Sequence, residues 1–113
     1  NTVDVEGFFI SRTDHALRIL DAVGADNAFL QYDFYHAQVM QGDLIATFAR
    51  HKDRIGHVQI ADNPGRNEPG TGEINYGVVF SELDRLGYDG FVGCEYKPRG
   101  KTSDGLDWMK PYI

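Results

Sequence analysis

The chain has 113 residues, 42% of them hydrophobic and 12% aromatic, which is the size and composition of one small globular domain. Its formal charge of -6, from 17 acidic and 11 basic residues, argues against a nucleic acid or an anionic membrane as partner. No apolar run approaches the roughly 20 residues that cross a bilayer. The single cysteine, Cys94, cannot form an internal disulfide. These features favour a reducing, cytoplasmic setting.

The first half of the chain predicts two helices with a strand between them. Residues 11–23 carry apolar side chains at helical spacing, and Ser11 with Asp14 resembles a capping box. Residues 28–33 have few charges before the last position and predict a strand. Asp43 is expected to cap the helix that follows it.

The second half repeats the same rhythm. Residues 57–61 predict a strand, and residues 62–74 a loop rich in glycine and proline. Asn75 is expected to cap a third helix, residues 91–95 to form a third strand, and residues 103–109 a short last helix. Strands that alternate with amphipathic helices predict the α/β class with a parallel sheet. In such sheets the chemistry lies at the carboxyl ends of the strands.

Polar residues interrupt the three apolar strands near their ends. Alternation places Gln31 and Asp33 on one face of the first strand, and His57 and Gln59 together on the second, while Glu95 closes the third. Asp33, His57 and Glu95 on successive parallel strands could therefore converge on one point. Oxygen ligands with one imidazole suit Mn²⁺ or Mg²⁺, and also Zn²⁺ or Co²⁺.

Each of these residues also has a purely structural interpretation. Asp33 could simply cap a helix, and His57 could be a hydrogen-bonded core histidine. Glu95 is harder to explain in this way, because a buried glutamate among apolar strand residues needs a partner or a metal. His36 follows Asp33 by three residues and could bind a substrate oxygen or be a surface histidine.

The loop after the second predicted strand is long for a strand-to-helix connection. Its Gly-X-Gly lacks the third glycine of a dinucleotide-binding fingerprint, and no Gly-Lys-Ser/Thr follows to make a phosphate loop. One interpretation is a plain turn with a helix cap. The other is an ordered loop over a site, in which Arg66 grips a carboxylate through two hydrogen bonds.

Four segments together resemble one enzyme family. They are Gln31–His36, Gly56–Pro64, Glu68–Tyr76 and Gly93–Pro98. In order and spacing they are similar to the hydroxypyruvate isomerases, which are xylose isomerase-like TIM barrels. The resemblance implies a (β/α)₈ barrel of about 250 residues. It further implies that residues 1–113 form a single partial domain, the C-terminal part of that barrel, with the N-terminal strands absent.

The resemblance also implies roles for individual residues. In such barrels Glu, Asp, His and Glu from four strands hold a divalent metal, Mg²⁺ or Mn²⁺, and Asp33, His57 and Glu95 match the last three. Glu95 would also be catalytic, as one of two glutamates on opposite sides of the substrate. The first glutamate would end a strand just before Asn1, so the isolated chain is expected to lack part of the site. His36 and Arg66 would bind the substrate.

The implied reaction interconverts hydroxypyruvate and tartronate semialdehyde by proton transfer through an enediolate that the metal stabilises. An isomerase of another small keto sugar acid, such as a 2-oxo-tetronate, is an alternative. An apurinic endonuclease shares the barrel but needs more histidines and a basic groove, which the charge disfavours. A non-catalytic piece without the first glutamate is a further alternative. The expected partners are the small substrate and either further copies of the chain or a complementary N-terminal part.

Overall fold

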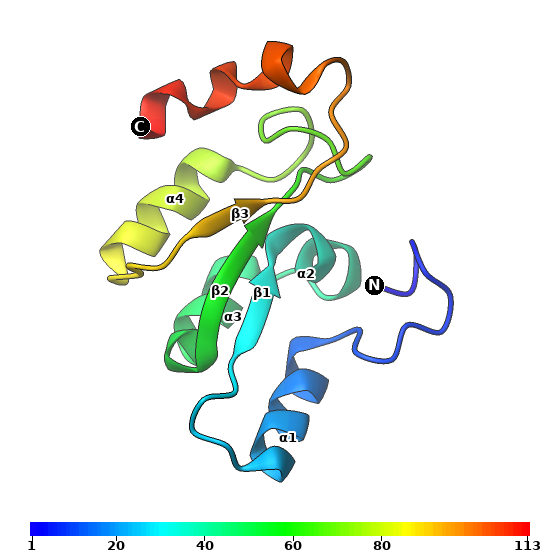
Figure 1. Ribbon diagram of the computed structural model, residues 1–113, viewed down its shortest axis with the longest axis vertical. Helices are drawn as coiled ribbons and strands as arrows, with labels where there is room; N and C mark the ends of the chain where they lie inside the picture. The colour runs from blue at the N-terminus through cyan, green and yellow to red at the C-terminus, as the bar shows by residue number, and fades with distance from the viewer.

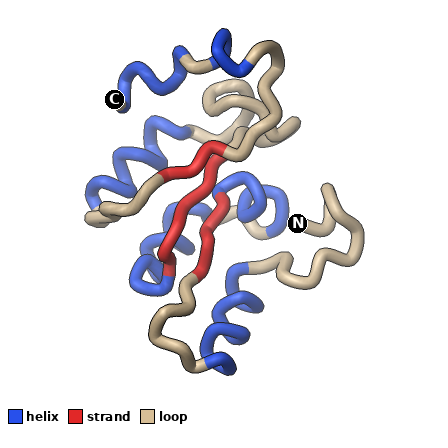
Figure 2. Tube along the Cα trace, viewed as in Figure 1, coloured by secondary structure: helices blue, strands red, loops and turns tan.

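Three parallel strands form the centre of the computed structural model, which describes residues 1–113 (Figure 1). Strands β1 (Leu30–Asp33), β2 (Ile55–Ile60) and β3 (Val92–Cys94) lie in the order β1-β2-β3. Both neighbouring pairs are parallel. Helical segments connect each strand to the next, as Figure 2 shows. The α/β class and the parallel sheet predicted from the sequence are therefore confirmed.

The helices connect the strands and continue past them. The α-helices are α1 (Thr13–Val23), α2 (Phe34–Met40), α3 (Leu44–His51) and α4 (Tyr76–Arg85), and 3₁₀ turns span Lys52–Arg54, Thr102–Gly105 and Asp107–Tyr112. The C-terminal segment is thus 3₁₀ rather than α-helical, and it contains Pro111, which cannot donate a backbone hydrogen bond. None of the helices has both the length and the apolar composition to cross a membrane.

Helix starts differ from the sequence-based predictions at two places. Helix α1 begins after Arg12 without a side-chain cap, and its Thr13 N–H donates instead to Gln41 Oε1 at 3.1 Å. Asp43 stands at the start of α3 in a left-handed conformation (φ 49°) and makes no capping bond. The predicted cap at Asn75 is confirmed, since its side chain accepts from the Val78 N–H at 3.2 Å.

The core lies between the sheet and helices α2, α3 and α4. Val58 and Ile60 point from β2 into this layer and are completely buried. Phe48 of α3 fits beside them, with its ring 6.0 Å from that of Tyr32 and 6.1 Å from that of Phe34. These contacts hold β1 and β2 in one register, and that register sets the position of the polar residues on the opposite face.

Replacement of Phe48 by alanine is expected to lower the free energy of unfolding by about 3–5 kcal/mol, because it removes a fully buried ring and leaves a cavity. Phe91→Ala is the matched control, since Phe91 is 89% exposed and its loss should change stability by no more than about 0.5 kcal/mol. Urea titration of both variants followed by circular dichroism measures the difference. Equal effects would contradict the described core.

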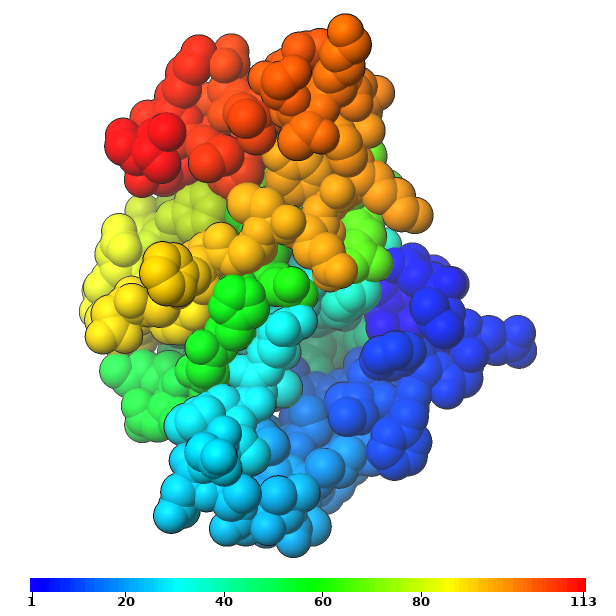
Figure 3. All heavy atoms as spheres, viewed as in Figure 1, coloured from blue at the N-terminus to red at the C-terminus, as the bar shows by residue number.

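The other face of the sheet carries the polar strand residues. The side-chain amides of Gln31 and Gln59 meet there at 2.5 Å. A Cβ atom on Gly93 would lie 2.9 Å from His57 Nε2 and 3.5 Å from Gln59 Cγ, so β2 and β3 present this row on the same face. A hollow of about 630 Å³ opens between this face, the N-terminal segment and α1, and the space-filling view shows it as the recess beside the N-terminal residues (Figure 3).

Candidate metal and substrate site

Asp33 ends β1 and has a different role for each of its carboxylate oxygens. Oδ1 accepts the backbone N–H of His36 at 3.0 Å and so caps α2. Oδ2 is buried without any hydrogen-bond partner, although the residue is only 7% exposed. A buried anionic oxygen without a partner is costly, so it indicates a ligand that this atom is built to meet. Asp33 can therefore cap α2 through Oδ1 and bind a ligand through Oδ2 at the same time.

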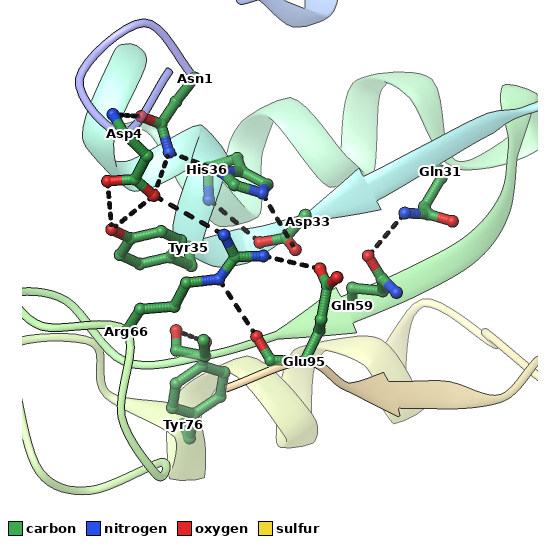
Figure 4. Close-up of polar contacts among 11 residues, drawn as sticks. Asn1, Asp4, Gln31, Asp33, Tyr35, His36, Gln59, Arg66, Tyr76 and Glu95 are labelled. Carbon is green, nitrogen blue, oxygen red and sulfur yellow. Dashed lines mark hydrogen bonds and ion pairs between the residues drawn. The ribbon is translucent and has the colours of Figure 1, made fainter. Parts of the chain in front are cut away.

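Asp33, His36 and Glu95 offer ligand atoms that all lie within 4.8 Å of one another (Figure 4). All three residues line the 630 Å³ hollow. Two carboxylates, one of which carries the buried oxygen that has no partner, fit a divalent cation such as Mg²⁺ or Mn²⁺, with the imidazole beside them. The convergence of Asp33 and Glu95 at the carboxyl ends of their strands agrees with the arrangement expected from the alternation of the strands.

His57 is not in this group, so the convergence expected for Asp33, His57 and Glu95 is seen for Asp33 and Glu95 but not for His57. The partner of His57 across the sheet is Gln31, whereas the partner of Asp33 is Gln59. His57 therefore lies two residues, about 6.6 Å, deeper along the strand direction than the layer of Asp33. The side chain that stands at the level of Asp33 on β2 is Gln59.

The neighbours of His36 decide which of its ring nitrogens carries the proton. Asn1 Oδ1 accepts the N–H groups of Val3 and Asp4 at 3.0 and 2.7 Å, which orients the amide. Asn1 Nδ2 therefore faces His36 Nδ1, 2.6 Å away, and is the donor of that bond. In neutral His36 the proton is then on Nε2, which makes this nitrogen a donor rather than a metal ligand.

Burial lowers the pKa of His36 below its ordinary value; the carboxylate of Asp33 opposes this shift, and the charge of Arg66 adds to it. Burial therefore favours the neutral form of the ring. Its Nε2 lies 3.9 Å from Asp33 Oδ2, at the edge of the hollow. A neutral imidazole that donates from Nε2 suits the substrate-binding role expected for His36.

Arg66 reaches the site from the loop that follows β2. Its Nη2 pairs with Glu95 Oε2 at 2.7 Å, and its Nε donates to the Glu95 backbone oxygen at 3.3 Å. Its Nη1 lies 3.7 Å from Asp4 Oδ2, and its guanidinium sits 5.4 Å from the ring centre of Tyr35. Arg66 is thus held at the mouth of the site between two carboxylates.

Glu95 is more accessible than its sequence context predicts. Its side chain is 56% exposed, against 20% for Arg66. The expectation of a buried glutamate was based on the apolar residues of its strand. In the structure Glu95 lies just beyond the end of β3, where its N–H donates to Ile60 O at 3.1 Å and its side chain projects over the uncovered face.

Asp4 is a member of the site that the sequence did not indicate. Desolvation alone would raise the pKa of Asp4, but hydrogen bonds from Asn1 and Tyr35 and the charge of Arg66 outweigh it and lower the pKa. The Tyr35 hydroxyl donates to both Asp4 oxygens at 3.1 Å. Asp4 therefore remains an anion that positions Arg66 from the side opposite Glu95.

Polar residues gathered at the carboxyl ends of parallel strands are typical of α/β enzymes, both barrels and open sheets, and comparison with known proteins identifies the family. The model of the xylose isomerase-like TIM barrel family matches residues 3–112. The chain belongs to this family.

The similar proteins include sugar-acid isomerases. Over 112 residues the chain is 52% identical to a hydroxypyruvate isomerase of Escherichia coli, covering 99% of the chain and 43% of that protein. It is 49% identical to a 2-oxo-tetronate isomerase of Cupriavidus necator, covering 100% of the chain and 44% of that protein. The chain thus spans less than half the length of these relatives.

A solved structure confirms the partial barrel. A crystal structure of a Brucella melitensis protein described as AP endonuclease, family 2, superposes with a TM-score of 0.95 at 46% sequence identity. The match covers 99% of the chain and 43% of that protein. The three strands and their helices are therefore one part of a TIM barrel, as the resemblance implied.

Proposed function

We propose that this chain belongs to a metal-dependent isomerase that interconverts hydroxypyruvate and tartronate semialdehyde. The observation that carries the proposal is the gathering of Asp33, His36 and Glu95, together with the buried Asp33 Oδ2 that has no hydrogen-bond partner. The 52% identity to a hydroxypyruvate isomerase supports hydroxypyruvate as the substrate. The charge of -6 disfavours the phosphate backbone that an apurinic endonuclease must bind.

Asp33 and Glu95 would hold the divalent cation. The amide oxygen of Gln59, which also accepts from Gln31 Nε2 at 2.5 Å, would be a further ligand from the strand between them. Asp33 and Gln59 are partners in the sheet, and Glu95 continues β3 two residues beyond Gly93, the partner of Gln59. When bound, such an ion polarises the carbonyl and hydroxyl oxygens of a keto acid. A second glutamate, expected from the resemblance, would complete the metal shell from outside this chain.

Glu95 would remove a proton from the C3 hydroxymethyl carbon of hydroxypyruvate, leaving an enediolate. Return of a proton to C2, with a proton shift from the C3 oxygen to the C2 oxygen, yields tartronate semialdehyde. Glu95 suits this work because it is anionic, accessible from the hollow and oriented by Arg66 at 2.7 Å. His36 would donate from Nε2 to a substrate oxygen on which charge develops.

A 2-oxo-tetronate is the second candidate substrate, favoured by the 49% identity to the Cupriavidus necator isomerase. Both candidates present a carboxylate next to a carbonyl. Arg66 is only 20% exposed and already carries two acidic neighbours, so a substrate carboxylate would exchange with one of them. The longer tetronate would need more of the hollow than the three-carbon acid.

The test measures turnover of hydroxypyruvate and of a 2-oxo-tetronate with Mn²⁺ or Mg²⁺, with EDTA as control. It uses the 113-residue chain and a hybrid barrel, in which residues 1–113 replace the segment they match in the E. coli hydroxypyruvate isomerase. Metal-dependent turnover by the hybrid barrel supports the proposal, and the faster substrate identifies the preference. A folded hybrid barrel without turnover of either acid would contradict it.

In the hybrid barrel, Arg66→Ala is expected to raise KM for hydroxypyruvate by about 10- to 100-fold, the value of one or two charge-assisted hydrogen bonds. The neutral analogue dihydroxyacetone should be affected far less. Arg85→Ala is the matched control, because Arg85 is an exposed arginine on α4 that pairs with Glu82. Equal KM changes for the acid and the neutral ketose would remove Arg66 from carboxylate binding.

A further inference from the structure

Asp62 is a completely buried carboxylate two residues beyond the end of β2, and no cationic side chain pairs with it. Its two oxygens accept four backbone N–H groups. Oδ1 accepts from Asn63 at 2.9 Å and from Ile74 at 3.0 Å, while Oδ2 accepts from Gly70 at 2.8 Å and from Gly72 at 2.9 Å. These donors span both ends of the loop, so one side chain closes it into a ring.

The ring is packed tightly around this carboxylate. A Cβ on Gly72 would lie 2.2 Å from Asn63 O and 2.7 Å from Asp62 Oδ1, so only glycine fits there. The Asp62 N–H donates to Asn67 O at 2.9 Å across the loop. Arg66 lies at the tip of the ring with a left-handed backbone (φ 56°), a conformation that a non-glycine residue adopts at a cost. The surrounding hydrogen bonds must therefore hold it.

The same ring is joined to the segment that carries Glu95. The Lys97 N–H donates to Arg66 O at 2.6 Å, and Asn67 Nδ2 donates to Lys97 O at 2.7 Å. Buried Glu68 accepts the Arg99 N–H at 3.0 Å. The backbone of Arg66 is thus fixed relative to residues just beyond Glu95, and the 2.7 Å pair between the Arg66 and Glu95 side chains follows from this frame.

We propose that Asp62 is a positioning residue for the active site: its carboxylate orders the loop so that Arg66 faces Glu95 and the substrate carboxylate. The proposal rests on the proposed function for the roles of Arg66 and Glu95. A carboxylate is required because all four ring N–H groups need acceptors. An asparagine amide offers one oxygen and one NH₂ group, so in either orientation two N–H groups face a donor. Loss of the charge should therefore loosen the loop without removing any catalytic group.

Asp62→Asn in the hybrid barrel tests the proposal, with Asp53→Asn as the matched control on an exposed residue of the same type. We expect a rise of at least about tenfold in KM for hydroxypyruvate, with a smaller change in kcat, and no change for the control. In an Arg66→Ala background, Asp62→Asn should raise KM less than about twofold. A loosened loop then carries no Arg66 guanidinium whose position it could disturb. A general loss of folded enzyme would instead lower kcat equally in both backgrounds, which would overturn the proposal.

Amide hydrogen exchange tests the ordering of the loop by Asp62 independently of whether the proposed function is correct. In Asp62→Asn, the amides of Gly70, Gly72 and Ile74 should exchange at least about tenfold faster, while those of β2 keep their protection. If wild type shows no turnover but these amides lose protection, the proposed function fails and the ordering of the loop by Asp62 is retained. Unchanged protection in the variant would overturn the proposal whatever the activity.

Discussion

Replacement of Glu95 by glutamine is expected to lower kcat for hydroxypyruvate in the hybrid barrel by at least about 10³-fold, while the fold is retained. A positioned general base contributes about 10²–10⁴-fold, and a glutamine amide cannot accept the C3 proton at neutral pH. Glu95 also contributes one of the anionic oxygens of the candidate metal group. Glu95→Gln removes both the general base and the anionic metal ligand in one isosteric change. Because the side chain is 56% exposed, the change should cost little folding stability.

Glu82→Gln serves as the control for this measurement, since Glu82 lies on α4, pairs with Arg85 and does not line the hollow. Its kcat should equal that of the wild type. Circular dichroism and thermal melts of both variants establish that each is folded. Turnover by Glu95→Gln within a few-fold of the wild type would remove Glu95 from the proton path and leave it at most a contact of Arg66.

The order of strands and helices followed from local signals. Short apolar runs bounded by polar residues predicted β1, β2 and β3, and Asn75 was correctly predicted to cap α4. Helix α2 was not predicted, because its seven residues follow β1 without any break. The signal that could have found it is Asp33, which caps a helix when the chain turns immediately after the strand.

The sequence placed Asp33 and Glu95 on the face where the structure brings them together, but it also placed His57 at their level. Alternation within a strand decides the face, so Asp33 and Glu95 converge as expected. Depth depends on the register between strands, which packing in the core sets. Register placed Gln59 beside Asp33 and left His57 one pleat deeper, beside Gln31. The sequence motif contained both residues, and nothing local distinguished them.

The contacts of Arg66 were beyond local inference. Its pairing with Glu95 joins residues 29 apart in the chain, and its contact with Asp4 joins residues 62 apart (66 minus 4). Both contacts depend on the ring closed by Asp62. From the sequence alone, Asp62 was only the first residue of a predicted loop. Long-range hydrogen bonds of buried carboxylates are visible only once the backbone donors have been placed.

Asp33→Asn is expected to weaken Mn²⁺ binding by the hybrid barrel about 100-fold. The substitution leaves Oδ1 to accept the His36 N–H at 3.0 Å, so the cap of α2 is retained. It replaces the buried, partnerless Oδ2 by an NH₂ group that repels a cation. Removal of a supporting outer residue alone typically costs 10–100-fold in metal affinity, and loss of an anionic ligand costs at least the upper part of that range. Calorimetric titration with Mn²⁺ measures the change without requiring turnover.

Two further variants decide which residue of β2 completes the metal shell. Gln59→Leu should weaken Mn²⁺ binding by roughly tenfold or more, since it removes an oxygen donor at the level of Asp33. His57→Gln should leave the affinity within about twofold, because His57 is the sheet partner of Gln31 rather than of Asp33 and is not in the group of gathered ligand atoms. If His57→Gln instead matched the loss seen in Asp33→Asn, the metal would be bound deeper in the barrel. The set expected from the sequence, Asp33, His57 and Glu95, would then be the functional one.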